Sequence, residues 1–299
     1  MPGEFEFIDW IRTQQKAGGI VSVAAGDDLA VLDWPAGELL LVGVDQVLDG
    51  VHFDSAVHLP RDIGRKVMNR NLSDCAAMAC LPAAAVATVA LPRSASMDYA
   101  KELYLGMKEA AEKYGCAVVG GDTASWDGKL AMTVSILGRS AGIRPVLRSG
   151  AKAGDTIYLT GPLGGSILGR HLRFEPRIEL ARELAGRGVV HAMIDVSDGL
   201  SRDLRHICRE SGLGAVIDAE RIPLHADALE LSKYTGRPPI EHALHDGEDH
   251  ELIVVGTSGL GSPLIEIGRM VPGEGIILRT GAREDRLEAG GWEHRFEMR

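Results

Sequence analysis

The stretch Ile194-Asp195-Val196-Ser197-Asp198-Gly199-Leu200 places two carboxylates three residues apart where the sequence pattern changes. Before it, residues 191–196 form an apolar run typical of a strand, and from Leu200 onward the apolar residues follow helical spacing. Such a junction offers helix N-terminal amides to an anion and carboxylate oxygens to a hard cation. The stretch therefore predicts a turn that binds metal-bound phosphate; the simpler alternative is that Ser197 and Asp198 only cap the helix.

Composition narrows the class of protein. The chain has 299 residues, 45% of them hydrophobic and 25% charged, as expected of a soluble globular protein with two domains. The net charge of −10 argues against a nucleic-acid or anionic-membrane partner, since either favours a basic patch. It leaves a nucleotide ligand open, because bound Mg²⁺ supplies positive charge locally.

Cysteine usage and the N-terminus bear on the compartment. The four cysteines form no Cys-x-x-Cys pair, which argues against a zinc site or a disulfide framework and fits a reducing cytoplasm. The first residues are acidic and resemble no signal peptide, and no apolar run approaches the ~20 residues of a membrane-spanning helix. We therefore expect a cytoplasmic protein that does not enter a membrane.

Strand and helix patterns alternate along the chain, which predicts a mixed α/β fold. A polar segment rich in Gly and Arg, residues 138–154, predicts the boundary between domains 1–140 and 141–299. In the first domain we expect helices at 4–16, 61–80 and 97–114 and strands at 29–32, 39–44, 83–90, 116–119 and 129–137. In the second we expect strands at 156–160, 191–196, 215–218 and 251–255, helices between them, and a last helix and strand before a polar tail.

Six aspartates lie at or beside the ends of these elements, where a charge is not needed for solubility alone. They are Asp28, Asp45, Asp74, Asp122, Asp195 and Asp198. If the fold brings them together, repulsion between them requires cations, and Mg²⁺ suits single carboxylates that share it with water and substrate phosphate. Each also has a simpler interpretation: turns at 26–28 and 120–122, and a solvated helix residue at Asp74.

Standard phosphate-binding motifs are missing. The chain has no Gly-x-x-x-x-Gly-Lys-Ser/Thr segment and no protein-kinase glycine loop, and the turn at residues 161–166 has no lysine. If the chain binds ATP, it does so with another fold.

Seven segments together resemble the motif series of the thiamine-monophosphate kinase family, in that family's order and across nearly the whole chain. They are Gly26-Asp27-Asp28, Asp45 with Asp49-Gly50-Val51-His52-Phe53, Asn71-Leu72-Ser73-Asp74, Gly120-Gly121-Asp122-Thr123, Arg148-Ser149-Gly150-Ala151-Lys152-Ala153-Gly154-Asp155, Ile194 to Leu200, and Gly247-Glu248-Asp249.

This resemblance implies a two-domain α/β fold like that of aminoimidazole ribonucleotide synthetase. The N-terminal sheet would pair with its copy in a homodimer, and the C-terminal domain would close over the nucleotide. The reaction implied is direct, Mg²⁺-assisted transfer of the ATP γ-phosphoryl group to thiamine monophosphate, with no covalent phosphoenzyme.

The resemblance also implies roles for single residues. All six aspartates would bind several Mg²⁺ ions. The ATP contacts would be Tyr104, Gly121, Asp122, Arg148 and Ser197. His52, Glu248 and Trp292 would hold thiamine monophosphate, although His52 could be a surface histidine and Trp292 a packing residue.

The chain departs from the family pattern near the acceptor side. Gly43 and Val44 stand where the family has Ser-Thr, which removes two hydroxyls beside Asp45 and weakens the case for one magnesium. Other changes fall at Gly165, His245 and His250. ATP binding is therefore better supported than the identity of the acceptor.

Two classes of alternative function remain open. Another enzyme of the superfamily is one: selenophosphate synthetase would need a cysteine before Cys75, and the hydrogenase-maturation dehydratase one after Cys208. Aminoimidazole ribonucleotide synthetase itself lacks the Gly-Val-His-Phe segment. A non-catalytic Mg-ATP-binding dimer is the alternative from another class.

Overall fold

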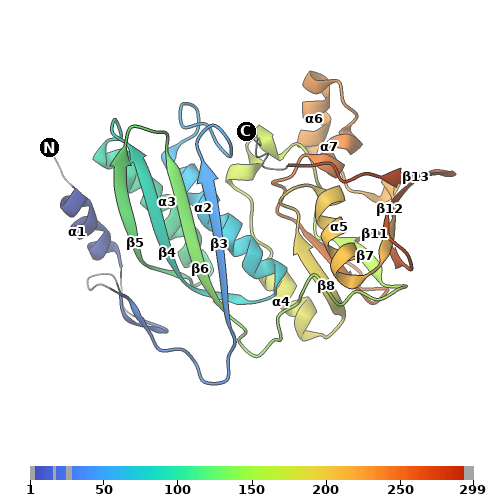
Figure 1. Cartoon of the computed structure of the whole chain (residues 1–299), viewed down its shortest axis with the longest axis horizontal. Helices are drawn as coiled ribbons and strands as arrows, with labels where there is room; N and C mark the ends of the chain where they lie inside the picture. The colour runs from blue at the N-terminus through green and yellow to red at the C-terminus, as the bar shows by residue number, and fades with distance from the viewer. Residues whose placement is uncertain (1–3, 16–17, 25–28, 293–299) are drawn as a thin grey trace, which may run out of the picture. The chain divides into compact units, whose positions relative to one another are not determined.

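The computed structural model describes residues 4–15, 18–24 and 29–292. The chain divides into two compact units, one of residues 1–75 and 80–142 and one of residues 76–79 and 143–299. Figure 1 shows the elements of both units in chain order. In the described part of the chain, no helix has both the length and the apolar character needed to cross a membrane.

The first unit is built on a four-stranded sheet of order β3-β6-β4-β5, in which only β4 and β5 are parallel. A short β1–β2 pair lies outside this sheet. The elements are α1 (Glu4–Gln14), β1 (Val21–Val23), β2 (Val31–Leu32), β3 (Leu40–Leu48), α2 (Pro60–Ala77), β4 (Leu81–Pro92), α3 (Met97–Lys113), β5 (Ala117–Trp126) and β6 (Ala131–Arg139).

Helices α2 and α3 cover one face of this sheet (Figure 1). They cross at Gly64 and Gly106, where an added Cβ would lie 1.9 Å from the carbonyl oxygens of Leu103 and Arg61 respectively. Only glycine permits this approach. The alternation of strand residues puts Val47, Val134 and Ile136 under the helices and leaves the opposite face open.

The second unit contains a seven-stranded sheet of order β13-β12-β9-β11-β7-β10-β8. Its strands are β7 (Thr156–Leu159), β8 (Val190–Asp195), β9 (Gly214–Asp218), β10 (Leu252–Gly256), β11 (Ile265–Val271), β12 (Gly275–Thr280) and β13 (Arg283–Leu287). Its helices are η1 (Ser166–Leu168), η2 (Arg170–Leu172), α4 (Ile178–Gly186), α5 (Leu200–Ser211), η3 (Ala219–Arg221), α6 (Ala226–Thr235) and α7 (Pro239–His245).

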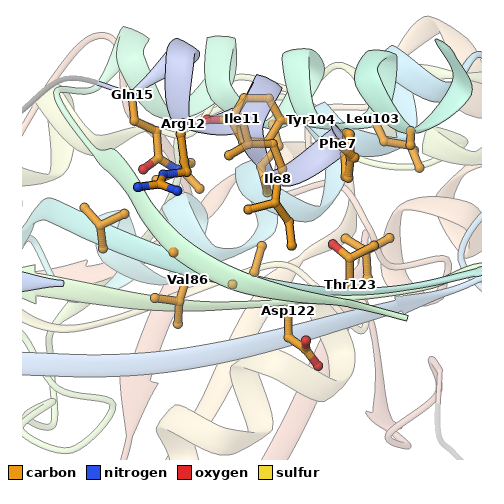
Figure 2. Close-up of a pocket in the computed structure, with 18 of the residues that line it drawn as sticks. Phe7, Ile8, Ile11, Arg12, Gln15, Val86, Leu103, Tyr104, Asp122 and Thr123 are labelled. Carbon is orange, nitrogen blue, oxygen red and sulfur yellow. The ribbon is translucent and has the colours of Figure 1, made fainter. Parts of the chain in front are cut away.

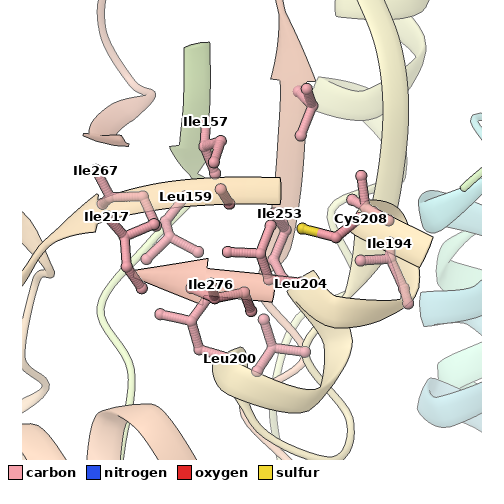
Figure 3. Close-up of a cluster of buried hydrophobic side chains, with 14 of the residues drawn as sticks. Ile157, Leu159, Ile194, Leu200, Leu204, Cys208, Ile217, Ile253, Ile267 and Ile276 are labelled. Carbon is pink, nitrogen blue, oxygen red and sulfur yellow. The ribbon is translucent and has the colours of Figure 1, made fainter. Parts of the chain in front are cut away.

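The core of the second unit lies between the sheet and α5. Leu200 and Leu204 of α5 pack with Ile194, Ile217 and Ile253 of the strands, and all five side chains are buried (Figure 3). The junction at residues 194–200 is therefore anchored on both sides by apolar contacts. This anchoring fixes the position of the polar turn between β8 and α5.

Two expectations about the elements are wrong. Residues 120–122 are no strand end: β5 continues through them to Trp126. The last predicted helix is absent from the described residues, where three strands follow β10. Gly259, Gly261 and Pro263 disfavour a helix before β11, and from Ile265 the apolar residues alternate as in a strand.

Candidate active site

The turn between β8 and α5 is stabilised from within the helix. Helix α5 begins at Leu200 with Gly199 before it and has no side-chain cap, so the capping alternative for Ser197 and Asp198 is wrong. Asp203 takes the capping role from inside the first turn, because its Oδ2 accepts hydrogen bonds from the backbone N–H groups of Asp198 (3.0 Å) and Gly199 (3.1 Å).

Sequence reasoning missed Asp203, a carboxylate on the first turn of α5 that is only 2% exposed. Burial raises its pKa well above the usual value, and the carboxylates of Asp195 and Asp198 raise the pKa further. The charges of Asp195 and Asp198 thus act on the Asp203 carboxylate. The sequence does contain a signal for Asp203: it is a carboxylate in the first turn of the helix, four residues after Gly199, where it can accept hydrogen bonds from the N–H groups of the turn.

Backbone hydrogen bonds join this turn to the segment before β10. The N–H of His250 donates to Val196 O and the N–H of Glu248 donates to Ser197 O, both at 2.8 Å. Gly247 makes the approach possible, because its φ is +64° and an added Cβ would lie 2.7 Å from Ser197 O. The predicted acceptor residue Glu248 is therefore beside the predicted phosphate contact Ser197.

Trp292 joins the same group from the far end of the chain. Its backbone N–H donates to Asp198 O at 3.1 Å, and its side chain is 53% exposed. The second unit thus gathers the predicted residues Ser197, Asp198, Glu248 and Trp292 around one turn. We define these four residues as the acceptor cluster.

Two ion pairs hold the segment at residues 247–251 in place. Asp249 accepts from Gly164 N (2.9 Å) and from Arg170 Nη2 (2.8 Å), and burial raises its pKa to about 6. Glu251 accepts a two-pronged contact from Arg177, at 2.9 and 2.6 Å. Because both carboxylates are buried and paired, the backbone between them is fixed.

His250 lies between these two anchors and contacts Asp195. Its Nδ1 is 3.2 Å from Asp195 Oδ2, and its ring stacks on Phe174 with centroids 3.9 Å apart and planes 16° apart. The imidazole is 2% exposed. Asp195, at the end of β8, is 4% exposed and is therefore a buried carboxylate with an imidazole beside it.

Arg148 lies on a different segment of the second unit. Leu147 O accepts from Met193 N at 3.1 Å, so this segment runs beside β8, and Arg148 itself is exposed. Burial lowers the pKa of His206 on α5, the charge of Arg148 lowers it further, and Asp198 opposes them. His206 thus experiences the charges of both Arg148 and Asp198.

Asp45 and Asp74 approach the same side of β3 in the first unit. Asp45 Oδ1 is 3.2 Å from Nη2 of Arg70 on α2. A Cβ on Gly43, two residues along the strand on the same face, would lie 3.9 Å from Asp74 Oδ2. The structure therefore brings these two predicted metal ligands to one face of the sheet.

Asp122 lies on the opposite face. It pairs with Thr88 of β4, which pairs with Thr133 of β6, which pairs with Gln46 of β3. Paired residues share a face and neighbours alternate, so Asp122 and Asp45 point to opposite sides of the sheet. The expectation that the first domain's aspartates converge is wrong for this pair within one chain.

A cavity of about 360 Å³ lies between α1, α3 and the β4–β5 pair (Figure 2). Its wall is mostly apolar and includes Ile8, Tyr104 and Gly121. Burial raises the pKa of Tyr104, so its hydroxyl stays protonated at neutral pH. Figure 2 shows the Asp122 carboxylate on the other side of the strands from Tyr104.

His52 lies on the turn after β3. Its Nδ1 accepts from the N–H of Leu48 at 3.1 Å, which places the proton of the neutral ring on Nε2. Lys66 of α2, with no exposed surface, donates to His52 O at 2.6 Å and holds the turn against the helix. The turn is thus anchored at both its backbone and its ring.

The donor set fits Mg²⁺ better than a metal that needs a closed cage of protein ligands. Among the residues that the structure describes, no three His, Cys, Asp or Glu side chains converge on one point. Asp28 lies outside the described residues. Single carboxylates near one another, such as Asp45 and Asp74 on one side of β3, suit an ion that keeps several waters and takes phosphate oxygens from a substrate.

Comparison with known proteins gives a consistent result. Residues 26–140 match the family "AIR synthase related protein, N-terminal domain" and residues 152–265 match "AIR synthase related protein, C-terminal domain". The chain is 41% identical to the thiamine-monophosphate kinase of Rhodopirellula baltica over 308 residues, 97% of each chain. It is 32% identical to that of Aquifex aeolicus over 98% of each chain.

Solved structures show the same similarity. Thiamine-monophosphate kinase from Stenotrophomonas maltophilia superposes with a TM-score of 0.80 at 32% identity, covering 92% of this chain and 96% of the other. A structure described as AaThiL complexed with AMPPCP and TMP gives a TM-score of 0.79 at 31% identity, over 98% and 97%. Escherichia coli HypE, a hydrogenase maturation protein, shares the fold at 18% identity.

Proposed function

This chain belongs to the thiamine-monophosphate kinases of the AIR synthase related family, and from that premise we infer that it transfers the γ-phosphoryl group of ATP to thiamine monophosphate. The product is thiamine diphosphate. One observation in the structure carries the inference: the acceptor cluster brings Ser197 and Asp198 against Glu248 and Trp292. Such a reaction needs the residues that bind the ATP phosphates and those that bind thiamine monophosphate to lie next to each other.

The acceptor side uses groups suited to a flat cationic ring and a phosphate. Trp292, half exposed, can stack on the positively charged ring, and Glu248 can accept from its amine. His52 carries its proton on Nε2 and can donate it to a phosphate oxygen. We propose these three residues as the thiamine monophosphate contacts.

The nucleotide side is supported by the cavity beside α3. Its apolar wall, with Tyr104 and Gly121, fits a planar base. We propose that Asp122, Ser197 and Arg148 contact the phosphates directly or through a cation. The turn before α5 adds the helix N-terminus, which favours negative charge.

The chemistry needs positioning more than a strong base. The attacking oxygen belongs to a phosphate and is already anionic near neutral pH, so the residues act by aligning two polyanions in line. Bound Mg²⁺ would offset the repulsion between them. We propose Asp45, Asp74, Asp122, Asp195 and Asp198 as ligands of several Mg²⁺ ions. Asp122 and Asp45 face opposite sides of the sheet within one chain, so they would bind different ions. The prediction for Asp28 stands on sequence alone.

We also propose a homodimer formed by the open face of the four-stranded sheet. Leu40, Val42 and Val44 of β3 are 54%, 69% and 62% exposed, and Val86 of β4 is 43% exposed. Such a row of apolar side chains marks an interaction surface. Asp122 lies on this same face, so pairing of two copies would place it at the contact between them.

The proposed function is tested with purified protein, Mg-ATP and thiamine monophosphate, by following thiamine diphosphate and ADP. We expect both products in equal amounts, no phosphorylated protein during turnover, and no turnover by Asp195→Asn. ATP binding without thiamine diphosphate would favour the non-catalytic alternative. Full activity of Asp195→Asn would remove that residue from the metal site.

A further inference from the structure

We propose that His250 is a positioning residue that holds the Asp195 carboxylate in the orientation needed to bind Mg²⁺. The proposal rests on the proposed function, because it takes Asp195 as a metal ligand. It adds a role for a residue that is not among the ATP and thiamine monophosphate contacts proposed above.

The contact with Asp195 is the ring's polar contact. Nδ1 lies 3.2 Å from Asp195 Oδ2, while Nε2 is buried and has no hydrogen-bond partner among the described residues. A side chain that only filled space here would be better served by an apolar ring, since a buried unpaired nitrogen is unfavourable. The imidazole is therefore explained by its contact with the carboxylate.

The ring is held rigidly enough to fix another group. It stacks on Phe174 at 3.9 Å, it is 2% exposed, and its backbone N–H donates to Val196 O. Its φ of +51° is uncommon for a residue other than glycine. Such a conformation persists only where the surroundings determine it, and here the anchored neighbours Asp249 and Glu251 do so.

A fixed ring has a defined effect on a carboxylate ligand. Asp195 is confined to one orientation before a cation arrives, so less side-chain entropy is lost on binding. Hydrogen-bond partners of metal ligands typically change metal affinity by about 10–100-fold when removed. We expect loss of the His250 contact to lie at the lower end, because Asp195 itself remains.

The test compares His250→Phe, which keeps the stacked ring without its nitrogens, with His250→Asn, which restores a donor near Nδ1. Binding of Mn²⁺ in the presence of a non-hydrolysable ATP analogue is measured from the free ion by electron paramagnetic resonance. We expect affinity to fall about tenfold in the Phe variant and to recover in the Asn variant. Wild-type affinity in both variants would overturn the proposal.

His242 supplies the matched control. It is 1% exposed and its Nδ1 is 2.7 Å from Oδ2 of Asp246, whose side chain is 17% exposed, so it is also a buried histidine paired with a carboxylate. His242→Phe should lower the unfolding temperature and leave Mn²⁺ affinity unchanged. An equal loss of affinity in His242→Phe would show that any destabilised core gives the effect, and would contradict a specific role for His250.

A double-mutant cycle separates this proposal from the proposed function. If His250 acts through Asp195, His250→Phe adds little to the loss of affinity caused by Asp195→Asn. Additive losses would overturn the positioning role. If Asp195→Asn alone binds Mn²⁺ as the wild type does, the metal assignment of Asp195 itself fails, which is a different result from wild-type affinity in His250→Phe alone.

Discussion

Replacing Gly43 by serine should strengthen Mg²⁺ binding beside Asp74. An added Cβ would lie 3.5 Å from Ile136 Cγ2 and 3.9 Å from Asp74 Oδ2, so the side chain fits without a clash. The serine Oγ, one bond beyond this Cβ, can come within about 2.5–3.0 Å of Asp74 Oδ2, which is the distance of an O–H···O hydrogen bond. The family resemblance places a serine at this position.

The substitution has two separate effects, one on the stability of the fold and one on Mg²⁺ binding. A strand residue with a Cβ is favoured over glycine by roughly 0.5–1 kcal/mol, so the free energy of unfolding should rise in both Gly43→Ser and Gly43→Ala. Only serine adds a hydroxyl. If that hydroxyl contributes about 1 kcal/mol at the cation, it lowers the Mg²⁺ concentration for half-maximal turnover about fivefold.

The assay is steady-state formation of thiamine diphosphate at saturating ATP and thiamine monophosphate, with free Mg²⁺ varied. Gly43→Ala is the control for the backbone effect. The reasoning is refuted if the serine and alanine variants show the same Mg²⁺ dependence while both are stabilised, because the hydroxyl would then lie outside the metal site.

Three further predictions concern other parts of the chain. Because the folded protein holds the Asp249 proton more tightly than the unfolded chain does, the free energy of unfolding should fall by up to about 3 kcal/mol as the pH rises from about 4 to about 6. Urea unfolding measures this fall, which should be present in the wild type and missing from Asp249→Asn. An equal fall in Asp249→Asn would show that another group causes it. Trp292→Ala should raise the KM for thiamine monophosphate severalfold with the KM for ATP unchanged, and Trp292→Phe should recover part of the loss; equal changes in both KM values would argue against stacking. Gly121→Ala should destabilise the protein by about 1–3 kcal/mol, because its Cβ would lie 2.0 Å from Ala87 O, whereas Gly120→Ala, with 3.7 Å to the nearest atom, should unfold near the wild-type temperature.

Local periodicity was enough to predict most elements. The alternation in β6 and the helical spacing in α3 are properties of short segments, and the structure has both elements within two residues of the predicted bounds. The junction at residues 194–200 was recognised for the same reason. A strand that ends in a carboxylate before a helix can be read without knowing its neighbours.

Features set by neighbouring strands were not predictable in this way. Gly121 looked like a turn residue, yet it lies within β5. Glycine is needed there because the carbonyl of Ala87 on the neighbouring strand leaves no space for a side chain. Asp122 looked like a partner of Asp45, and only the register across three strands shows that they face opposite sides. The capping role of Asp203 likewise depends on the path of the turn, which its own sequence does not specify.

The segment at residues 248–251 divides its work by alternate positions. Asp249 and Glu251 are tied to Arg170 and Arg177, and their loss would release the backbone of the whole segment. Glu248 lies before them with its backbone N–H on Ser197 O, and His250 lies between them with its ring against Asp195. Substitutions in a lineage can therefore alter acceptor preference or cation affinity at the even positions while the odd positions keep the architecture, which makes this short segment a place where new substrate specificity can evolve without a new fold.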